Sequence, residues 1–427
     1  MDILVVGGGG REHAIIKAIK KSPLCGKIYC LPGNGGIASD AECVDIGAKD
    51  IPAITAFAVE KKVDFAIVAP DDPLVLGAVD ALAEKGIPCF GPNKAAAMIE
   101  GSKAFAKDLM RKYGIPTATY QTFDNADEAI RYISDQNSYP TVIKADGLAL
   151  GKGVIIAENF EEAKNAVKSI MLDKAFGESG NKIVIEEYLT GVEVSVLAFT
   201  DGKTIKPMVS SMDHKRALDG DKGLNTGGMG TVAPNPYYTK EVADACMEKI
   251  FLPTVQAMNS EGRTFKGCLY FGLMITKTGP KVIEYNCRFG DPETQVVLPL
   301  LKSDLLQIML AVSQGTLSET EVVFDNGAAC CVIIASGGYP QHYEKGKKID
   351  FGDVRESDDL LIYHAGTKLD KDGSLFTAGG RVLGVTATGK DLAEAVEKAY
   401  KAVEKISFEG SFYRKDIGKK ALAVLQR

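Results

Sequence analysis

Short apolar runs alternate with amphipathic segments through the first hundred residues of the chain. Strands are predicted at residues 3–6, 28–31, 65–68 and 88–90, and helices at 12–20, 51–61 and 75–85. Strands that alternate with helices indicate an open parallel α/β sheet with right-handed crossovers. The loops 7–11, 32–36 and 69–74 follow strand ends. We expect them to meet at the carboxyl edge of the sheet, where open α/β sheets bind ligands.

The pattern changes after residue 101. A helix is predicted at 102–113, and a compact block follows with strands at 141–144, 154–157 and 183–187. Apolar residues at 160, 163, 167 and 170 share one helix face inside this block. We interpret it as a small α+β lid. Further strands and a helix at 392–406 end the chain. We divide the chain into 1–100, 101–119 (a helix of the larger unit), 120–188 (the lid), 189–321 (the larger unit) and 322–427.

Composition places the chain among soluble proteins with several domains. Its 427 residues exceed the size at which one hydrophobic core stops growing, and apolar residues make up 45% of them. The formal net charge of −6 gives no basic surface for a nucleic-acid backbone, so we expect no nucleic-acid partner. Small phosphorylated ligands stay compatible with this charge, because local lysines and backbone amides can hold them.

Cysteine and histidine usage favours a reducing compartment and disfavours a zinc site. The nine cysteines contain no C-x-x-C pair, and the four histidines show no zinc-ligand spacing. The segment MDILVVGGGG has no basic start and fits a first strand rather than a signal peptide. No apolar stretch approaches the roughly 20 residues that span a bilayer. We therefore expect a cytoplasmic protein without membrane association.

The densest chemical signal lies at residues 281–295, KVIEYNCRFGDPETQ. Side chains of a strand alternate between its faces, so Glu284 and Asn286 project to the same side and can place two oxygens on one divalent cation. An arginine, an aspartate and a glutamate follow in the next loop. A single carboxylate at a strand end is usually a solvated turn residue, but this group of polar residues favours a reaction site.

Two glycine-rich segments are candidates for phosphate binding. The turn 7–10 lacks the third glycine of a dinucleotide fingerprint, because Glu12 or His13 stands there, and no acid ends the second strand. An NAD site is therefore disfavoured. The turn and Arg11 suffice for one phosphate, an interpretation that we weigh equally with a plain tight turn. The segment 143–154, IKADGLALGKGV, has no G-x-x-x-x-G-K-[ST], which excludes a P-loop.

In order along the chain, these segments resemble the ATP-grasp enzymes, in which two α+β units clamp ATP. Within that group the chain is similar to the phosphoribosylamine–glycine ligases, or glycinamide ribonucleotide synthetases. The similarity rests on GREHA (10–14), PGNGG (32–36), GSKAFAK (101–107), IKADGLALGKGV (143–154), EEYLTGVEVS (186–195), DHKRALDGDKGLNTGGMG (213–230), EYNCRFGDPETQ (284–295) and GGRVLGV (379–385). It implies a Rossmann-like N-terminal α/β domain, an ATP-grasp pair of α+β units and a small C-terminal α+β domain.

The resemblance implies where ATP and its metal would bind. The residues implied for the phosphates are Lys103, Lys144, Gly151, Lys152 and Gly153. The residues implied for adenine and ribose are Glu186, Glu187, Tyr188, Leu189 and Glu193. Glu284 and Asn286 would hold Mg²⁺ or Mn²⁺, which neutralises charge on the transferring phosphoryl group.

The resemblance also implies an acceptor site for glycine and 5-phosphoribosylamine. The implied catalytic residues are Asp213, Lys215, Arg288 and Asp291. The implied substrate contacts are His214, Arg216, Gly227, Gly228, Met229, Gly230, Gly290, Pro292 and Glu293. The phosphoribosylamine phosphate would lie near Gly9, Arg11, Gly33, Asn34 and Gly36. We expect His214 to position substrate by hydrogen bonding rather than to act as a base.

The implied reaction has two steps and needs no protein nucleophile. The carboxylate of glycine attacks the γ-phosphate of ATP to give glycyl phosphate, and the amine of 5-phosphoribosylamine then displaces phosphate, a step of de novo purine biosynthesis. Catalysis would rest on positioning and charge stabilisation, with the lid excluding water. We expect a stand-alone enzyme, as a monomer or small homo-oligomer.

The chain departs from the family pattern at three places. Asp71 and Asp72 stand where the family usually has one Glu, Met212 where it often has Gln, and Leu224 where Pro is frequent. These changes affect residues expected to contact the acceptor substrate.

Another ATP-grasp carboxylate–amine ligase of purine metabolism is the nearest alternative function. A Rossmann oxidoreductase is disfavoured because this chain lacks the required third glycine and the acid after the second strand. A non-catalytic nucleotide-binding regulator would require loss of the phosphate and metal residues, and these are present.

Overall fold

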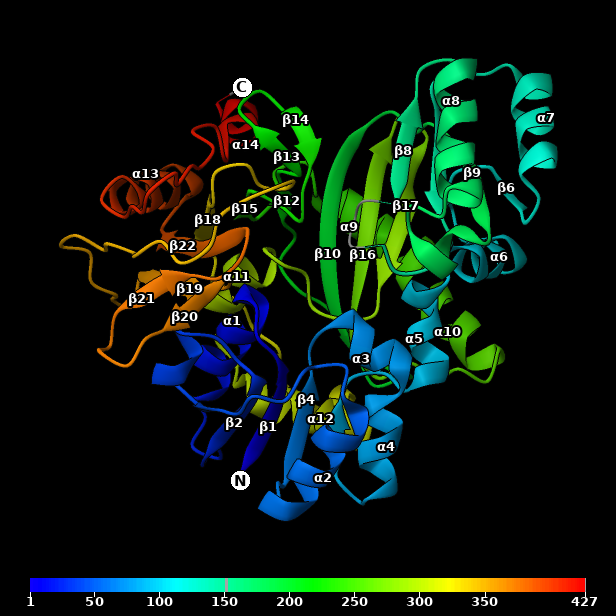
Figure 1. Ribbon diagram of the computed structural model, residues 1–427. Helices are drawn as coiled ribbons and strands as arrows, with labels where there is room; N and C mark the ends of the chain where they lie inside the picture. Colours follow the sequence, from blue (N-terminus) through cyan, green and yellow to red (C-terminus); the bar gives the residue numbers. More distant parts are fainter. Residues whose placement is uncertain (150–152, 427) are drawn as a thin grey trace.

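The N-terminal residues form the parallel sheet that the sequence predicts. The computed structural model describes residues 1–149 and 153–426, and Figure 1 shows how its elements are arranged. The strands lie in the order β3-β2-β1-β4-β5, and all pair in parallel. Their bounds are β1 Ile3–Gly7, β2 Ile28–Pro32, β3 Glu42–Cys43, β4 Phe65–Val68 and β5 Cys89–Phe90. The strand order reverses between β1 and β4, and sheets of this class bind ligands at the carboxyl ends beside such a point.

Helices flank this sheet, and one of them differs from the prediction. Their bounds are α1 Gly10–Ile19, α2 Ile51–Lys61, α3 Asp71–Leu76, α4 Ala78–Glu84 and α5 Lys94–Gly101. The single helix predicted at 75–85 is wrong, because Gly77 adopts a left-handed φ of +97° between α3 and α4. The predicted loop 69–74 also contains the start of α3. An aspartate in the first turn of a helix is favoured by the helix dipole, which explains the early start at Asp71.

A four-stranded antiparallel sheet forms the upper right of Figure 1, in the order β6-β9-β7-β8. Its elements are β6 Tyr120–Phe123, α7 Ala126–Gln136, β7 Thr141–Ala145, β8 Val154–Ala157, α8 Phe160–Val167 and β9 Ile183–Glu187. The predicted strands of the lid are present, and β6 and α7 are additions to the prediction. The helices and strands bury an apolar cluster of their own, which includes Ile143, Ala163 and Ile170. A separate core of this kind allows a unit to move as one body.

A second antiparallel sheet lies between the lid and the C-terminal strands, in the order β11-β10-β16-β17. Its strands are β10 Val192–Thr200, β11 Ile205–Pro207, β16 Gly267–Thr276 and β17 Gly279–Asn286. The helices α6 Lys103–Lys112, α9 Lys240–Cys246 and α10 Leu252–Ser260 belong to the same region. A bulge in β17 pairs Val282 with Leu273 but Glu284 with Gly272, so Ile283 is the extra residue.

The C-terminal residues build a third sheet, in the order β12-β15-β18-β22-β19. Its strands are β12 Met212–Asp213, β15 Gly230–Ala233, β18 Ala328–Ala335, β19 Leu360–His364 and β22 Arg381–Gly389. Two hairpins accompany it, β13 Arg216–Leu218 with β14 Lys222–Asn225 and β20 Thr367–Leu369 with β21 Leu375–Thr377. The helices α11 Thr294–Val297, α12 Leu305–Gln314, α13 Leu392–Val403 and α14 Lys419–Leu425 complete the chain. β12 and β15 come from residues that the sequence division assigns to 189–321, so this sheet crosses the predicted boundary at 322.

The N-terminal and C-terminal regions lie against each other through buried polar contacts. The backbone N–H of His364 donates to Nδ1 of His13 over 2.8 Å, and the Asn34 side-chain amide donates to the carbonyls of Gly8 and His364. All nine cysteines carry free thiols. No helix within the described residues is both long and apolar enough to cross a bilayer.

Candidate active site

The end of β17 carries the residues predicted to hold a metal. Glu284 lies opposite Gly272 and Asn286 opposite Tyr270, so the two side chains share one face of the sheet. A Cβ at Gly272 would lie 3.0 Å from Cγ of Glu284, so the glycine gives the carboxylate its room. Nδ2 of Asn286 donates to Oε1 of Glu100 over 2.9 Å. Oδ1 of Asn286, a hard oxygen suited to Mg²⁺, is left for another partner.

Lysines surround Glu284. Its pKa is lowered by the charges of Lys215, Lys144 and Lys103, although burial opposes this shift. Nζ of Lys215 lies 3.8 Å from Oε1 of Glu284 and 3.5 Å from Oε2 of Glu193. Burial lowers the pKa of Lys103, against the opposing charge of Glu284. We call this cluster of opposite charges the charged floor; it contains Lys103, Lys144, Lys215, Glu193 and Glu284.

The ammonium group of Lys144 is already engaged by two groups of the chain. Nζ of Lys144 lies 3.0 Å from Oε1 of Glu186 and donates to the carbonyl of Ile283 over 3.1 Å. The other oxygen of Glu186 lies 2.9 Å from Nζ of Lys107, which also donates to Thr117. All three charged side chains are buried. Lys107 received no role from the sequence, although its spacing of four from Lys103 places both on one face of α6.

The remaining residues predicted for the nucleotide follow β9 or lie in β10. Oε1 of Glu187 accepts from the backbone N–H of Thr119 over 3.1 Å and from Lys281 over 3.2 Å, so its side chain is engaged. Tyr188, Leu189 and Glu193 are at least partly exposed. The carbonyl of Gly153 accepts from the backbone N–H of Ala145 within the lid sheet. Gly151 and Lys152 lie outside the described residues.

The three segments that carry the most specific resemblance meet at Gly228. Its φ is +113°, and a Cβ there would lie 2.4 Å from Cδ of Pro292 and 2.7 Å from Oδ1 of Asp213. Only glycine therefore allows this approach. Burial and the Glu293 carboxylate raise the pKa of Asp213 well above its ordinary value. Gly290 serves the same loop, because a Cβ there would lie 2.3 Å from Oε2 of Glu293.

Arg381 from β22 ties these segments together, a role that was not predicted from the sequence. Nη1 of Arg381 donates to the carbonyls of Gly227, Gly228 and Asp291, and Nη2 lies 3.2 Å from Oδ2 of Asp291. Although burial opposes it, the charge of Arg381 lowers the pKa of Asp291, followed by the charge of Arg11. In GGRVLGV an arginine starts a strand of apolar residues, but this segment alone does not reveal the partners of that arginine.

A second group of opposite charges lies where the N-terminal sheet faces the end of β17. Nη2 of Arg288 lies 2.9 Å from Oε1 of Glu100. The charges of Glu100 and Asp71 raise the pKa of Arg288 against the effect of burial. The charges of Arg288 and Arg11 in turn lower the pKa of Asp71, also against burial. Asp71 is one methylene shorter than the glutamate that is usual in the family, but its carboxylate still interacts with two arginines.

In the turn predicted to bind the phosphoribosylamine phosphate, the carboxylate of Glu12 already bonds to groups that would bind the phosphate. Oε2 of Glu12 accepts from the backbone N–H of Gly9 over 2.6 Å, and Oε1 accepts from Nε of Arg11 over 2.7 Å. The helix N-terminus therefore already holds an anion, the carboxylate of Glu12. Nη1 of Arg11 donates to the carbonyl of Phe289 and joins this turn to the loop after β17.

The neighbouring loop is packed against the C-terminal region. Oδ1 of Asn34 accepts from the backbone N–H groups of Gly36 and Ile37, and its amide nitrogen is also bonded. A Cβ at Gly36 would lie 2.0 Å from the ring of His364, and one at Gly33 would lie 2.3 Å from Sγ of Cys43. These residues have structural reasons for their identity, and their contact with a phosphate stays a prediction.

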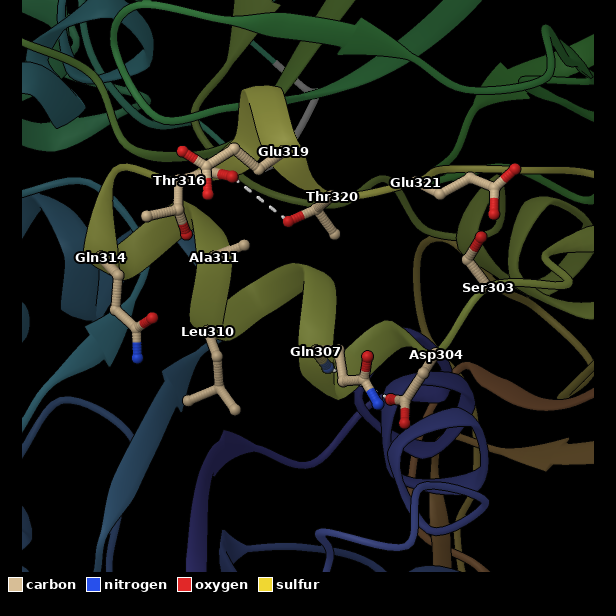
Figure 2. A pocket seen from close by; sticks show the side chains of 10 residues that line it. All are labelled: Ser303, Asp304, Gln307, Leu310, Ala311, Gln314, Thr316, Glu319, Thr320 and Glu321. Carbon is tan, nitrogen blue, oxygen red and sulfur yellow. Dashed lines mark hydrogen bonds between the residues drawn. The ribbon is translucent and has the colours of Figure 1, made fainter.

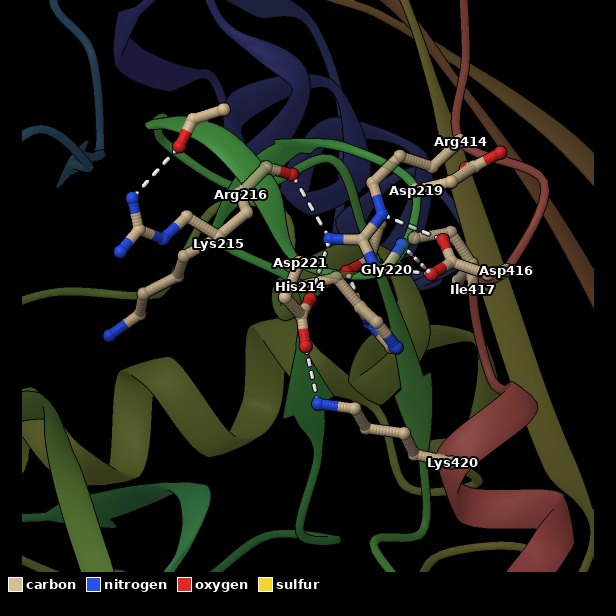
Figure 3. Close-up of polar contacts among 12 residues, drawn as sticks. His214, Lys215, Arg216, Asp219, Gly220, Asp221, Arg414, Asp416, Ile417 and Lys420 are labelled. Atoms are coloured by element: carbon tan, nitrogen blue, oxygen red, sulfur yellow. Dashed lines mark hydrogen bonds and ion pairs between the residues drawn. The ribbon is translucent and has the colours of Figure 1, made fainter.

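His214 and Arg216 are held by other parts of the chain. Nδ1 of His214 is bonded to the carbonyl of Gly230 over 3.1 Å, and burial followed by the charge of Arg414 lowers the pKa of His214 to about 4. Figure 3 shows Arg414 between Asp416 and the carbonyl of Arg216, so it anchors the hairpin that follows Lys215. The Arg216 guanidinium donates to Gly223 of that hairpin, and Met229 is fully buried.

A surface groove along α12 lies apart from these residues. Figure 2 shows its lining, which contains the carboxylates of Asp304, Glu319 and Glu321. Ser303, Gln307 and other polar or apolar side chains complete it, and no lysine or arginine is among them. Carboxylates without cations repel phosphate, so the groove does not suit ATP. None of the predicted site residues lines it.

Comparisons with known proteins point to one family. Models of the phosphoribosylglycinamide synthetase family match in three parts: the N domain at residues 1–100, the ATP-grasp (A) domain at 101–294 and the C domain at 329–420. The phosphoribosylamine–glycine ligase of Caldanaerobacter subterraneus is 50% identical over 98% of this chain and 99% of its own. That of Salmonella typhimurium is 48% identical over 99% of both chains.

Solved structures show the same relation. The crystal structure of the phosphoribosylamine–glycine ligase of Thermotoga maritima has a TM-score of 0.86 and 35% identity, covering 98% of this chain and all of that one. A biotin carboxylase of Campylobacter jejuni has a TM-score of 0.76 over 96% and 92% of the two chains, but only 16% identity, which shows the fold alone. The chain belongs to the phosphoribosylamine–glycine ligase family of ATP-grasp enzymes.

Proposed function

We propose that the chain joins glycine to 5-phosphoribosylamine with ATP, giving glycinamide ribonucleotide, ADP and phosphate. The observation that carries this proposal is the contact of Gly228 with Asp213 and Pro292. Lys215, two residues after Asp213, connects this contact to the charged floor around Glu284. A ligase that works through an acyl phosphate needs its acceptor loops beside the cations that hold ATP.

The residues at the end of β17 fit Mg²⁺ or Mn²⁺. Glu284 and Asn286 would supply two oxygens from one face of the sheet, and the amide nitrogen of Asn286 is turned towards Glu100. Mg²⁺ is commonly bound by one or two protein oxygens together with substrate phosphates. The metal would neutralise charge on the phosphate oxygens. Lys103 and Lys144 would approach the same phosphates from α6 and the lid.

In the first step the carboxylate of glycine attacks the γ-phosphorus, the bond to ADP breaks, and glycyl phosphate forms. Arg288 and Lys215 would hold the carboxylate and the transferring group in line. In the second step the amine attacks the acyl carbon and phosphate leaves. The carboxylate of Asp213, which lies beside Gly228, would take the proton that the amine loses. The lid would exclude the water that hydrolyses glycyl phosphate.

The finer assignments follow from the same geometry. Glu186, Glu187, Tyr188 and Leu189 would face adenine through their backbone, and Glu193 the ribose. Arg11 would bind the phosphate of phosphoribosylamine near Gly9, Gly33, Asn34 and Gly36, next to the crevice of the N-terminal sheet. We expect small-molecule substrates only, and a monomer or small homo-oligomer in the cytoplasm.

The test is ADP release by the purified protein with ATP and Mg²⁺. Glycine alone, phosphoribosylamine alone and both together are compared, and strong turnover is expected only with both. Glu284→Ala should abolish turnover, whereas Glu397→Ala, which removes an exposed carboxylate paired with Lys401, should not. Faster turnover with a different amino acid or amine would favour another ligase of purine metabolism. Full activity of Glu284→Ala would overturn the metal assignment.

A further inference from the structure

One buried carboxylate contacts three consecutive residues of the candidate active site. Glu100 lies near the end of α5, and its side chain is 6% exposed. Oε1 of Glu100 accepts from Nδ2 of Asn286 and from Nη2 of Arg288, both over 2.9 Å. Oε2 accepts from the backbone N–H of Cys287 over 2.6 Å. No other role for Glu100 emerges from the sequence or from the proposed reaction.

These contacts fix which atom of Asn286 faces the metal position. An ionised carboxylate has only acceptors, so the amide must turn its nitrogen to Glu100 and its oxygen away. Without Glu100 the amide could rotate and offer either atom. The bond to the backbone N–H of Cys287 also fixes the backbone at the end of β17. Asn286 and Arg288, on either side of Cys287, are therefore held together.

The same carboxylate also holds the guanidinium of Arg288. Nη2 of Arg288 donates to Oε1 of Glu100 over 2.9 Å. A bond at Nη2 also limits rotation of the planar guanidinium. Burial raises the pKa of Glu100, and the three donors oppose this shift because each bonds better to an ionised carboxylate.

We propose that Glu100 is a positioning residue, which orients Asn286 for the metal and Arg288 for the carboxylate substrate at the same time. This inference rests on the proposed function of Glu284 and Asn286. Partners that orient metal ligands in this way typically change metal affinity 10-fold to 100-fold when they are mutated. Glu100 would thus couple α5 of the N-terminal region to the metal and acceptor sites.

The experiment compares binding of a non-hydrolysable ATP analogue with and without Mg²⁺ by calorimetry. Glu100→Gln keeps the size of the side chain but replaces one acceptor oxygen by a donor. We expect the enhancement of analogue affinity by Mg²⁺ to fall at least 10-fold, with metal-free affinity within about twofold of the parent. Glu100→Asp keeps the charge but is one methylene shorter, so it should lose less of the Mg²⁺ enhancement. It replaces Glu100→Gln in the experiment if that variant does not fold.

Asp201 provides a matched control. It is 3% exposed and also accepts three hydrogen bonds, all from backbone N–H groups, of Lys203, Thr204 and Leu317. Asp201→Asn should therefore loosen a buried carboxylate without changing the Mg²⁺ effect. An equal loss in this control, or a full Mg²⁺ effect in both folded Glu100 variants, would overturn the inference.

A third variant separates this inference from the proposed function. Glu284→Ala should remove the Mg²⁺ enhancement altogether. If it keeps the enhancement, the metal assignment fails and the role of Glu100 fails with it. If Glu284→Ala loses the enhancement while the Glu100 variants keep it, only the role of Glu100 is refuted.

Discussion

Arg381 of the C-terminal sheet and Asp291 of the loop after β17 form an ion pair with a distance of 3.2 Å. They are 90 residues apart in sequence, and Arg381 also holds the carbonyls of Gly227 and Gly228. The C-terminal region thus supplies the cation that keeps two acceptor segments together. Because the pair is largely buried, removal of one partner leaves the other without compensation.

Substitution of Arg381 should therefore reduce the use of glycine more than the binding of ATP. Arg381→Met removes three hydrogen bonds and a charge, and we expect kcat/KM for glycine to fall at least tenfold, or about 1.4 kcal/mol. Arg381→Lys should recover little, because an ammonium cannot reproduce the planar fork. The measurement is ADP release over a range of glycine concentrations. An unchanged glycine dependence together with a weaker ATP dependence would contradict this prediction.

Lys107 should control how strongly Glu186 holds Lys144. In Lys107→Met, Glu186 keeps only Lys144 as its cation, so Lys144 should be less available to phosphate. We expect the KM for ATP to rise several-fold and the free energy of unfolding to fall by about 3 kcal/mol or more, because a buried pair loses one partner. ADP release over a range of ATP concentrations and urea unfolding measure the two effects.

The control for Lys107 is an exposed pair. Lys240 and Asp244 are paired at the surface of α9, and Lys240→Met should leave the free energy of unfolding nearly unchanged. Lys107→Arg keeps the charge and should retain most of the ATP affinity. If Lys107→Met lowers stability but leaves ATP affinity unchanged, Lys107 has a structural role only.

Protonation of His214 should weaken the fold in mild acid. Burial and then the charge of Arg414 lower the pKa of His214 to about 4, below the value of about 6.5 in the unfolded chain. The neutral ring therefore stabilises the fold above pH 6.5, and this contribution is lost as the pH falls towards 4. A shift of this size corresponds to about 3 kcal/mol.

Urea unfolding between pH 7.5 and 4.5 tests this prediction. His214→Gln should flatten the decrease, whereas His342→Gln, which changes an exposed residue, should leave it as in the parent. His13 and His364 also have lowered pKa values through burial, so part of the decrease should persist in His214→Gln. The lowered pKa of Asp416 acts only below the ordinary range of aspartate, nearer pH 2 to 4, and does not interfere.

The sequence predicted the parallel sheet, the lid strands and the family because these depend on local patterns and ordered motifs. It predicted that Glu284 and Asn286 share a face, since that follows from strand geometry. It did not predict Glu100, because a single acid in a helix carries no signal until the helix is placed beside β17. Arg381 was missed for the same reason: its partners are about 90 and 154 residues away.

Long-range pairing also explains the remaining differences in the fold. β12 and β15 join the C-terminal sheet although they lie about a hundred residues before it in the chain. No periodicity of a short segment reveals its partner strand. The break at Gly77 was hidden by a continuous apolar pattern on both sides of the glycine.

Gly228 should tolerate no side chain. Its φ of +113° disfavours any other residue, and a Cβ would lie 2.4 Å from Pro292 and 2.7 Å from Asp213. Gly228→Ala must therefore push apart the two acceptor segments, and we expect ligation to fall by at least a hundredfold, about 2.7 kcal/mol, with ADP binding unchanged. Gly262→Ala is the matched control, because φ there is +67° but nothing lies within 4 Å. It should cost about 1 kcal/mol of stability and no activity. Wild-type ligation by Gly228→Ala would show that these segments do not form the acceptor site.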